Sequence, residues 1–415
     1  MARRAGKEFQ VTDFPLIISV DDHVVEPPTL WRDRLPARVR DEGPRVERRF
    51  GQVAVRDGKT VFDDSVTEGP HTGWSDVWLY QDMVWPLHAG YAQYGVAKES
   101  REPVTYDEIH PGCWQQDERL KAMDLNHNEA SICFPTVPRF CGQTFLERGD
   151  KDVALLALRA WNDWMIEEWC GGPGAGRLIP LSLIPLWDVE LAAAEVRRCA
   201  ALGTTSIAFS EAPHALGLPS IHSGYWEPLW QACDETNIVV NMHIGSSSKM
   251  PSTSLDAPQF VGVTLTAENS VHAVADWIWS GIFARYPNLK IALSEGQVGW
   301  MPFFYERMDS AWRRAELYDA RIREVLPNPP SSYAKGHIYG CIFDDRAGLR
   351  ERDVIGMNQI MIEIDFPHSD STYPHSEKVL SDLAVEAGLS EEEVRLLVRG
   401  AAIECYNLER FGLTV

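Results

Sequence analysis

Acidic and imidazole side chains stand at the ends of several short apolar runs in this sequence. The first run ends in Asp21 and His23, a later one ends in His243, and the last ends in Asp365. Alternate residues of a strand share a face, so Asp21 and His23 point the same way while Asp22 points away. Two imidazoles and two carboxylates suit zinc, iron(II) or manganese(II). These residues therefore predict a divalent-metal site.

The apolar runs that carry these residues are typical of parallel strands covered on both faces, because they are β-branched or almost continuously apolar. Eight strands are expected, at 16–21, 130–135, 178–186, 205–210, 238–244, 290–295, 338–343 and 360–366. Helical patterns lie between and after them, at 116–127, 151–170, 188–202, 225–236, 264–285, 299–318, 376–387 and 390–408. This alternation predicts the α/β class and a distorted (β/α)8 barrel, also called a TIM barrel. An open doubly wound sheet is the alternative, and the lack of a Gly-rich loop after the first strand weakens its nucleotide-binding version.

In such a barrel the C-terminal ends of the strands line one mouth, where active sites are built. The sixth expected strand ends in Ser294 and Glu295, so Glu295 joins the candidates as a proton acceptor or as a ligand of a second metal. His272 and His368 are further candidate ligands, with Glu26 a weaker one; His368 is also expected to orient Asp365. Ser246 and Ser247 follow His243 and are predicted to contact substrate, whereas Asp370, His375 and Glu377 are expected to shape the loop after the last strand.

One stretch interrupts the alternation of strands and helices. Residues 27–115 are rich in Pro, Gly, Trp, Tyr and charged residues, with short strands expected near 46–62. Long loops in a compact domain are usually lids or binding segments. We therefore expect one barrel domain over 1–415, with 27–115 as an insertion above the barrel mouth that contributes to substrate binding, to its own core or to a subunit contact.

Composition excludes several classes of partner. The formal net charge of −21 disfavours nucleic acid and anionic membrane surfaces. The basic N-terminal segment lacks the apolar stretch of a signal peptide, and no apolar run is long enough for a transmembrane helix, so a cytoplasmic location is expected. The 8 cysteines form no CxxC pair and are expected to be small core residues rather than a disulfide framework.

Four segments carry a resemblance to a known family. They are ISVDDHVVEPPTLW (18–31), VVNMHIG (239–245), WSGIFARYPNLKIALSEG (279–296) and EIDFPHSD (363–370). In these the chain resembles the amidohydrolase superfamily, in the branch that includes aminocarboxymuconate semialdehyde decarboxylase. The resemblance implies metal ligands at Asp21, His23 and His243, and a metal-binding or proton-handling role for Asp365. Two departures are Asp21 in place of the first histidine, and Glu295 where the similar decarboxylases carry a histidine.

The leading functional expectation is a metal-dependent hydrolase acting on an amide, ester or thioester of a small molecule. One or two ions of iron, zinc or manganese would activate water, and Asp365, or Glu295, would carry the proton. Three alternatives stay open. They are a non-oxidative decarboxylase of an aromatic or enoic acid, an iron-dependent oxygenase, and a metal-binding partner subunit of a related active chain. The resemblance implies a homodimer.

Overall fold

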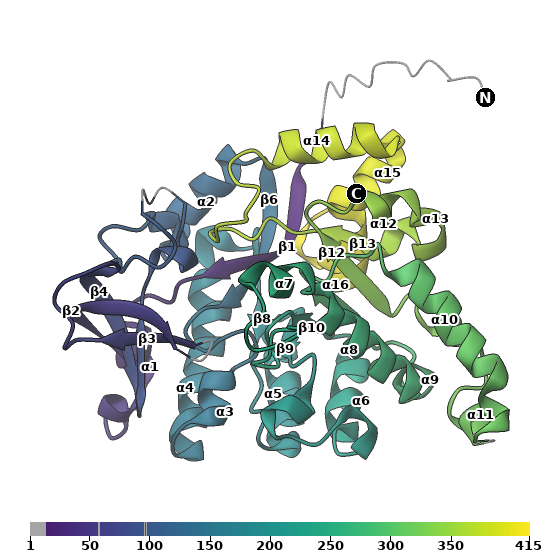
Figure 1. Ribbon diagram of the computed structural model, residues 1–415, viewed down its shortest axis with the longest axis horizontal. Coiled ribbons are helices and arrows are strands. Elements are labelled where there is room, and N and C mark those ends of the chain that lie inside the picture. The colour runs from purple at the N-terminus through teal and green to yellow at the C-terminus, as the bar shows by residue number, and fades with distance from the viewer. Residues whose placement is uncertain (1–13, 57–58, 95, 97, 320) are drawn as a thin grey trace.

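The computed structural model describes residues 14–56, 59–94, 96, 98–319 and 321–415 (Figure 1). The basic N-terminal segment 1–13, which carries the expectation about targeting, lies outside the described residues. None of the helices in the described ranges combines the length and the apolar character that crossing a bilayer requires.

Parallel strands form a closed ring at the centre of the fold. They are β1 (Ile17–Val24), β6 (Asn128–Pro135), β7 (Leu178–Ile179), β8 (Leu181–Ser182), β9 (Ser206–Phe209), β10 (Val239–His243), β11 (Ile291–Ser294), β12 (Ile338–Ile342) and β13 (Ile360–Ile362). Their order is β7-β6-β1-β13-β12-β11-β10-β9-β8. Pro180 separates β7 from β8 because it has no N–H for the ladder. Since β7 pairs with β6 and β8 pairs with β9, the segment 178–182 closes the ring as one strand. The predicted (β/α)8 barrel is confirmed.

Helices surround the ring in the expected alternation. They are α2 (Gln116–Leu125), α3 (Gln143–Glu147), α4 (Lys151–Trp164), α5 (Val189–Ala201), α6 (Glu227–Thr236), α7 (Gln259–Thr264), α8 (Ala267–Trp279), α9 (Ile282–Arg285), α10 (Met301–Arg314), α11 (Ile322–Val325), α12 (Arg346–Arg350), α13 (Arg352–Ile355), α14 (Ser376–Ala387), α15 (Glu391–Arg395) and α16 (Ala401–Tyr406). The Ser390 hydroxyl accepts from the Glu393 N–H, and the Glu393 carboxylate accepts from the Ser390 N–H. This capping box begins α15 at the position that the serine and the acidic residues after it predict.

Two expected elements are shorter in the structure. The strand expected at 178–186 ends at Ser182, after the break at Pro180. The helix expected at 264–285 begins as α8, since α7 already ends at Thr264, and it is interrupted by Gly281, whose φ of 69° lies in the left-handed region. A left-handed residue ends a right-handed helix, so α9 starts anew after it.

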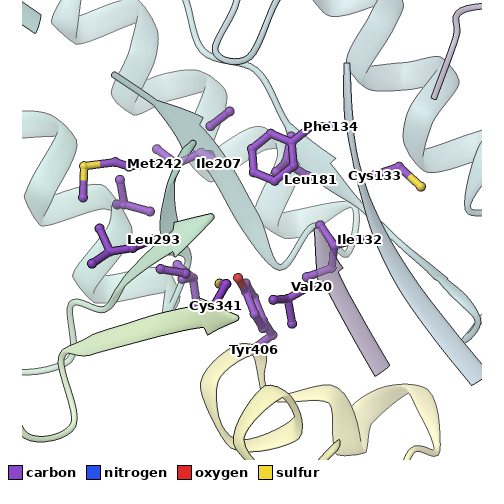
Figure 2. Packing of buried hydrophobic residues seen from close by; sticks show 14 of the residues in the cluster. Val20, Ile132, Cys133, Phe134, Leu181, Ile207, Met242, Leu293, Cys341 and Tyr406 are labelled. Carbon is purple, nitrogen blue, oxygen red and sulfur yellow. The ribbon is translucent and has the colours of Figure 1, made fainter. Parts of the chain in front are cut away.

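The hydrophobic core lies in and around the ring. Figure 2 shows part of it, in which Val20, Ile132 and Leu293 from three strands lie with Tyr406 of α16. All eight cysteines are buried and free, which confirms the expectation that they are small core residues.

The insertion after β1 contains its own antiparallel sheet. This sheet has the order β3-β2-β4-β5, from β2 (Arg45–Arg56), β3 (Lys59–Asp63), β4 (Thr72–Tyr80) and β5 (Met83–Pro86). It stands beside the barrel with the short helix α1 (Leu30–Arg34), and Tyr80 packs against Phe145 of α3 with ring centroids 5.8 Å apart (Figure 1). A short segment after β5 reaches the loop that follows β13, where the Gln93 N–H donates to the carbonyl of Pro367 (3.0 Å).

Candidate metal centre

Three strand ends bring the predicted ligands together. Asp21 and His23 come from β1, His243 from β10, and Asp365 follows β13. His243 Nε2 lies 3.3 Å from His23 Nε2 and 3.4 Å from Asp21 Oδ2. His23 Nε2 also lies 3.3 Å from Asp365 Oδ1. All four side chains are buried, so they form one compact group inside the barrel mouth.

Both carboxylate oxygens of Asp21 are buried and accept no hydrogen bond within the described ranges. The carboxylate of Asp365 lies in the same group and has His368 as its ion-pair partner. A buried carboxylate without a partner is strongly unfavourable, so such a site requires a proton or a cation. Two nitrogens bound to one tetrahedral ion at 2.0–2.1 Å lie roughly 3.3 Å apart, which is the spacing that His23 and His243 show. The residues present therefore fit a divalent metal ion.

Both imidazoles are neutral at physiological pH. Burial, together with His368, lowers the pKa of His23 to about 4. Burial, together with His23, lowers the pKa of His243 to about 3. His243 Nδ1 faces the Ile244 carbonyl at 2.7 Å and must donate there, so its Nε2 carries the lone pair. Neutral imidazole with Nε2 free is the form that binds metals.

Asp365 and His368 form an ion pair at the edge of this group. His368 Nδ1 lies 2.9 Å from Asp365 Oδ1, and the His368 ring stacks on His23 with centroids 3.9 Å apart. Burial opposes both charges, but the imidazolium lowers the pKa of Asp365 below its ordinary value and the carboxylate raises the pKa of His368. The His368 side chain is 18% exposed, so this pair can exchange a proton with the outside.

Two further acids lie beside the predicted ligands. Glu295 Oε2 is 3.9 Å from His243 Nδ1, and the Glu295 N–H donates to Glu363 Oε2 (2.8 Å). Glu363 is fully buried, and its Oε1 has no partner within the described ranges. Burial and the neighbouring acids raise the pKa of Glu363 to about 8 and that of Glu295 well above its ordinary value. Sequence reasoning missed Glu363, although it stands two positions before Asp365 in a strand-like run.

Glu295 and Asp365 share an unusual backbone conformation. Their φ angles are 56° and 60°, in the left-handed region. That region costs a non-glycine residue roughly 1 kcal/mol or more, and such residues gather at functional sites where the surrounding structure holds them. Strained backbone at the ends of two strands therefore sets the directions of both acidic side chains.

The outward face of β1 holds a second network that positions the ligands. The Asp22 carboxylate accepts from the Phe366 N–H (2.9 Å) and from the Ser131 hydroxyl. Arg119 donates to the carbonyl of His23 (2.5 Å). Burial raises the pKa of Asp22 to about 6, although Arg119 opposes the rise. This network fixes the backbone next to His23 and Asp365, and Asp22 points away from the metal group as predicted.

The two serines after His243 form hydrogen bonds with another buried acid, Glu211. The Ser247 hydroxyl donates to Glu211 Oε1 (2.8 Å), and the Ser246 hydroxyl accepts from the Glu211 N–H (2.9 Å). Gly245 and Asn269 also donate to Glu211 Oε1. The structure therefore engages the hydroxyls of Ser246 and Ser247 in holding Glu211. Glu211 was not among the predicted residues, although its place after the run 205–210 is a signal of the same kind.

Two candidate ligands lie outside the group. The His272 side chain is 72% exposed on α8 and lies 3.8 Å from Glu268, so it is not brought to the metal group. Its helix turns it to solvent, away from the other predicted ligands. Glu26 accepts hydrogen bonds from Thr136, Val137 and Trp161, which saturate its carboxylate with backbone and indole donors.

Aromatic rings surround the two ligand histidines. Phe140 stacks on His243 with ring centroids 4.2 Å apart, and Phe134 meets the same imidazole edge-on at 5.1 Å. Tyr91 of the insertion lies 6.2 Å from His368. The metal group therefore has planar, largely apolar walls that reach the insertion.

Known proteins share this architecture and sequence pattern. The amidohydrolase family model matches residues 84–408. The chain is 25% identical over 312 residues to 2-amino-3-carboxymuconate-6-semialdehyde decarboxylase of Dictyostelium discoideum, across 73% of this chain and 80% of that protein.

Solved structures agree on the fold. An amidohydrolase from Mycobacterium avium subsp. paratuberculosis matches with a TM-score of 0.69 and 19% identity, covering 94% of this chain and 99% of that one. A dihydroxybenzoic acid decarboxylase from Polaromonas, which holds manganese and the inhibitor 2-nitroresorcinol, matches with a TM-score of 0.55 and 20% identity, covering 74% and 90%. The family model spans most of the chain, and this chain belongs to the amidohydrolase family.

Proposed function

We propose that this protein is a metal-dependent lyase that removes CO2, without oxidation, from a small unsaturated or aromatic carboxylic acid. The observation that carries the proposal is the buried group of Asp21, His23, His243 and Asp365, found in a chain whose similarity covers 80% of a decarboxylase. The sequence favoured hydrolysis as the main reaction, with decarboxylation as an alternative. The similarity to named decarboxylases favours that alternative.

Asp21, His23, His243 and Asp365 would hold the ion. A divalent cation there supplies a Lewis acid that polarises a substrate oxygen and stabilises developing negative charge. The nitrogen and oxygen ligands suit manganese, iron or zinc, and the manganese in the Polaromonas decarboxylase supports manganese as the first ion to test.

The chain's own residues must supply one proton. When the bond between the carboxyl group and its neighbouring carbon breaks, the electron pair stays on that carbon and CO2 leaves. A proton must then form the new C–H bond. His368, paired with Asp365 at 2.9 Å and partly exposed, is placed to deliver that proton and to regain one from solvent.

The walls of the site support a planar substrate. Phe140 and Phe134 lie against His243, and Tyr91 approaches His368 from the insertion. Aromatic rings stack favourably on flat, unsaturated molecules. A hydroxybenzoate or a conjugated enoic acid fits this chemistry better than a saturated acid does.

Hydrolysis is the second candidate, and Glu295 favours it. A carboxylate at this strand end, 3.9 Å from His243, is suited to accept a proton from a metal-activated water. The resemblance to the decarboxylases implies a histidine at this position, and Glu295 departs from it.

One experiment separates the two reactions. Manganese-loaded protein is incubated in deuterated, 18O-labelled water with hydroxybenzoates, conjugated dicarboxylic acids, esters, amides and thioesters. Mass spectrometry then follows CO2 and the labels, while an oxygen electrode detects any oxygenase reaction. Decarboxylation releases CO2 and leaves one deuterium on the product carbon. Release of an 18O-labelled acid without CO2 from every active substrate would overturn the lyase proposal in favour of hydrolysis.

A further inference from the structure

Glu211 stands at the rim of the barrel mouth, beside the metal group but outside it. It follows the carboxyl end of β9, and its N–H donates to the Ser246 hydroxyl after β10 (2.9 Å). Its charge acts on Glu295, whose carboxylate lies 3.9 Å from His243. Within the described ranges, Glu211 belongs to none of the side-chain groups that are close enough together to hold one ion. The metal group therefore leaves this carboxylate without a cation.

One oxygen of the Glu211 carboxylate is fixed in place. Its Oε1 accepts from the Gly245 N–H (3.0 Å), the Ser247 hydroxyl (2.8 Å) and the Asn269 amide (2.9 Å). Gly245 has a φ of 83°, and a Cβ added there would lie 3.0 Å from the ring of Phe140. Since Phe140 is the ring that stacks on a ligand histidine, the turn that holds Glu211 packs against the aromatic wall of the metal group. The carboxylate is thereby oriented next to that wall.

The other oxygen, Oε2, has no hydrogen-bond partner among the described residues, and no Lys or Arg among them forms an ion pair with Glu211. The residue is only 4% exposed, yet Oε2 is not fully enclosed, so a bound molecule can reach it. Burial raises the pKa of Glu211 to about 7, against the effect of the donors to Oε1. An acceptor this deeply buried is unfavourable until a donor reaches it.

We propose that Glu211 is a specificity-determining residue, whose Oε2 accepts a hydrogen bond from a hydroxyl or amino group of the substrate. The inference rests on the proposed function and narrows it, because the flat acid must then carry an O–H or N–H donor besides its carboxyl group. A site with such an acceptor rejects an analogue that lacks the donor, since the buried oxygen is left unpaired. Ser247 then acts on the substrate through Glu211, whose carboxylate it positions.

The test compares ligands that differ only in this donor. Manganese-loaded protein is titrated with hydroxy- and aminobenzoates, with hydroxy- and amino-substituted conjugated dicarboxylic acids, and with the O-methyl or N,N-dimethyl counterpart of each. Calorimetry gives Kd, and CO2 release gives kcat and KM. We expect the wild-type protein to bind at least one donor-bearing acid about 10–100-fold more tightly than its methylated counterpart.

Glu211→Gln should lose this preference. Glutamine keeps the oxygen that accepts from Gly245, Ser247 and Asn269, and it replaces the other oxygen by an NH2 group that only donates. A methyl group that merely clashes with the site would disfavour the methylated ligand equally in both proteins. Glu190→Gln, which changes an exposed acid on α5, is the matched control and should keep the wild-type preference.

Equal affinity of the wild-type protein for both ligands of every pair, no binding of any of them, or an unchanged preference in folded Glu211→Gln would overturn the inference. Circular dichroism checks the fold of the variant. If it does not fold, a crystal structure of the wild-type protein with its tightest donor-bearing ligand decides, because it places either the donor or only a water within hydrogen-bond distance of Oε2. A donor preference that Glu211→Gln loses, without CO2 release, would uphold the role of Glu211 and contradict the lyase proposal. CO2 release without a donor preference would do the reverse.

Discussion

The Nε2 atoms of His23 and His243 lie 3.3 Å apart at the centre of the barrel mouth. The Nε2 of His243 carries a lone pair, because its Nδ1 donates to the carbonyl of Ile244. The carboxylate of Asp21 lies against the same nitrogen at 3.4 Å. The lone pair of His243 therefore faces a carboxylate, and this contact is repulsive until a cation lies between the two groups.

Removing the metal should destabilise the protein as well as inactivate it. An ion that binds only the folded chain adds about 2.7 kcal/mol to the free energy of unfolding at 100 times its Kd. We expect dipicolinate treatment to lower Tm by several degrees, and manganese to restore both Tm and turnover. Calorimetry of stripped and reloaded protein measures this. An unchanged Tm after verified metal loss would contradict the buried-ligand assignment.

His243→Ala and His272→Ala should behave oppositely. The first change removes a buried nitrogen of the metal group, and the second removes an exposed imidazole on α8. We expect His243→Ala to lose manganese from the metal group, and His272→Ala to keep wild-type metal content and turnover. Metal analysis with a turnover assay decides, and metal loss in His272→Ala would restore that residue as a ligand.

Asp365→Asn should abolish turnover while the chain still folds. Asparagine keeps the size of the side chain and tolerates the left-handed φ of 60° at this position. It cannot hold the proton of His368 as an ion pair, so kcat should fall at least about 100-fold. Asp344→Asn changes an exposed acid paired with Arg346 and is the control. Near-normal kcat in folded Asp365→Asn would remove this residue from the mechanism.

Asp22→Ala should weaken metal binding from outside the metal group. The change leaves the Phe366 N–H without its acceptor and frees the backbone beside Asp365. Loss of such supporting contacts typically costs 10–100-fold in metal affinity. Competition with a fluorescent chelator measures this Kd. If Asp22→Ala binds manganese as tightly as wild type, the network does not position the ligands.

Acid should destabilise the fold through His88 in the insertion. Burial lowers the pKa of His88 to about 4 from an ordinary value of 6.5. Between these values the unfolded chain binds more protons, so the free energy of unfolding falls as the pH drops from 6.5 to 4. The full contribution is about 3 kcal/mol. Urea titrations across this range should show a shallower pH dependence for His88→Gln, and an equal slope in both proteins would exclude His88.

Much of the centre is readable from the sequence because strand ends are local signals. Asp21, His23, His243 and Asp365 end apolar runs, and a barrel brings such ends to one mouth. Glu363 was missed because it lies inside its apolar run rather than at the end. Its spacing of two from Asp365 could have revealed it, because alternate residues of a strand share a face. His272 could have been placed from the helical spacing, because Ala273, Val274, Trp277 and Ile278 form the buried face of α8 and His272 does not lie on it.

The insertion was harder to predict because its sheet depends on distant pairing. Short strands were expected near 46–62, but Arg45–Arg56 also pairs with Thr72–Tyr80, across residues rich in turn formers. Antiparallel partners this far apart leave no local pattern that fixes their register. Two parts of the insertion reach the loop after β13: the Gln93 N–H donates to the Pro367 carbonyl, and the His110 ring lies 6.3 Å from that of Phe366.

The hydrogen bonds between β1 and the residues after β13 make the completion of the metal group depend on the order in which the chain is synthesised. The Asp365 N–H donates to the carbonyl of Asp21, and the Ile364 N–H donates to the Ser19 hydroxyl, across about 345 residues. A ribosome delivers Asp21 and His23 long before Asp365 emerges. During translation the barrel therefore lacks its last strand, and one ion can reach all four ligands only after nearly the whole chain has been made. A prematurely released chain that lacks this last strand would keep both histidines but would lose the hydrogen bonds that join β1 to the residues after β13.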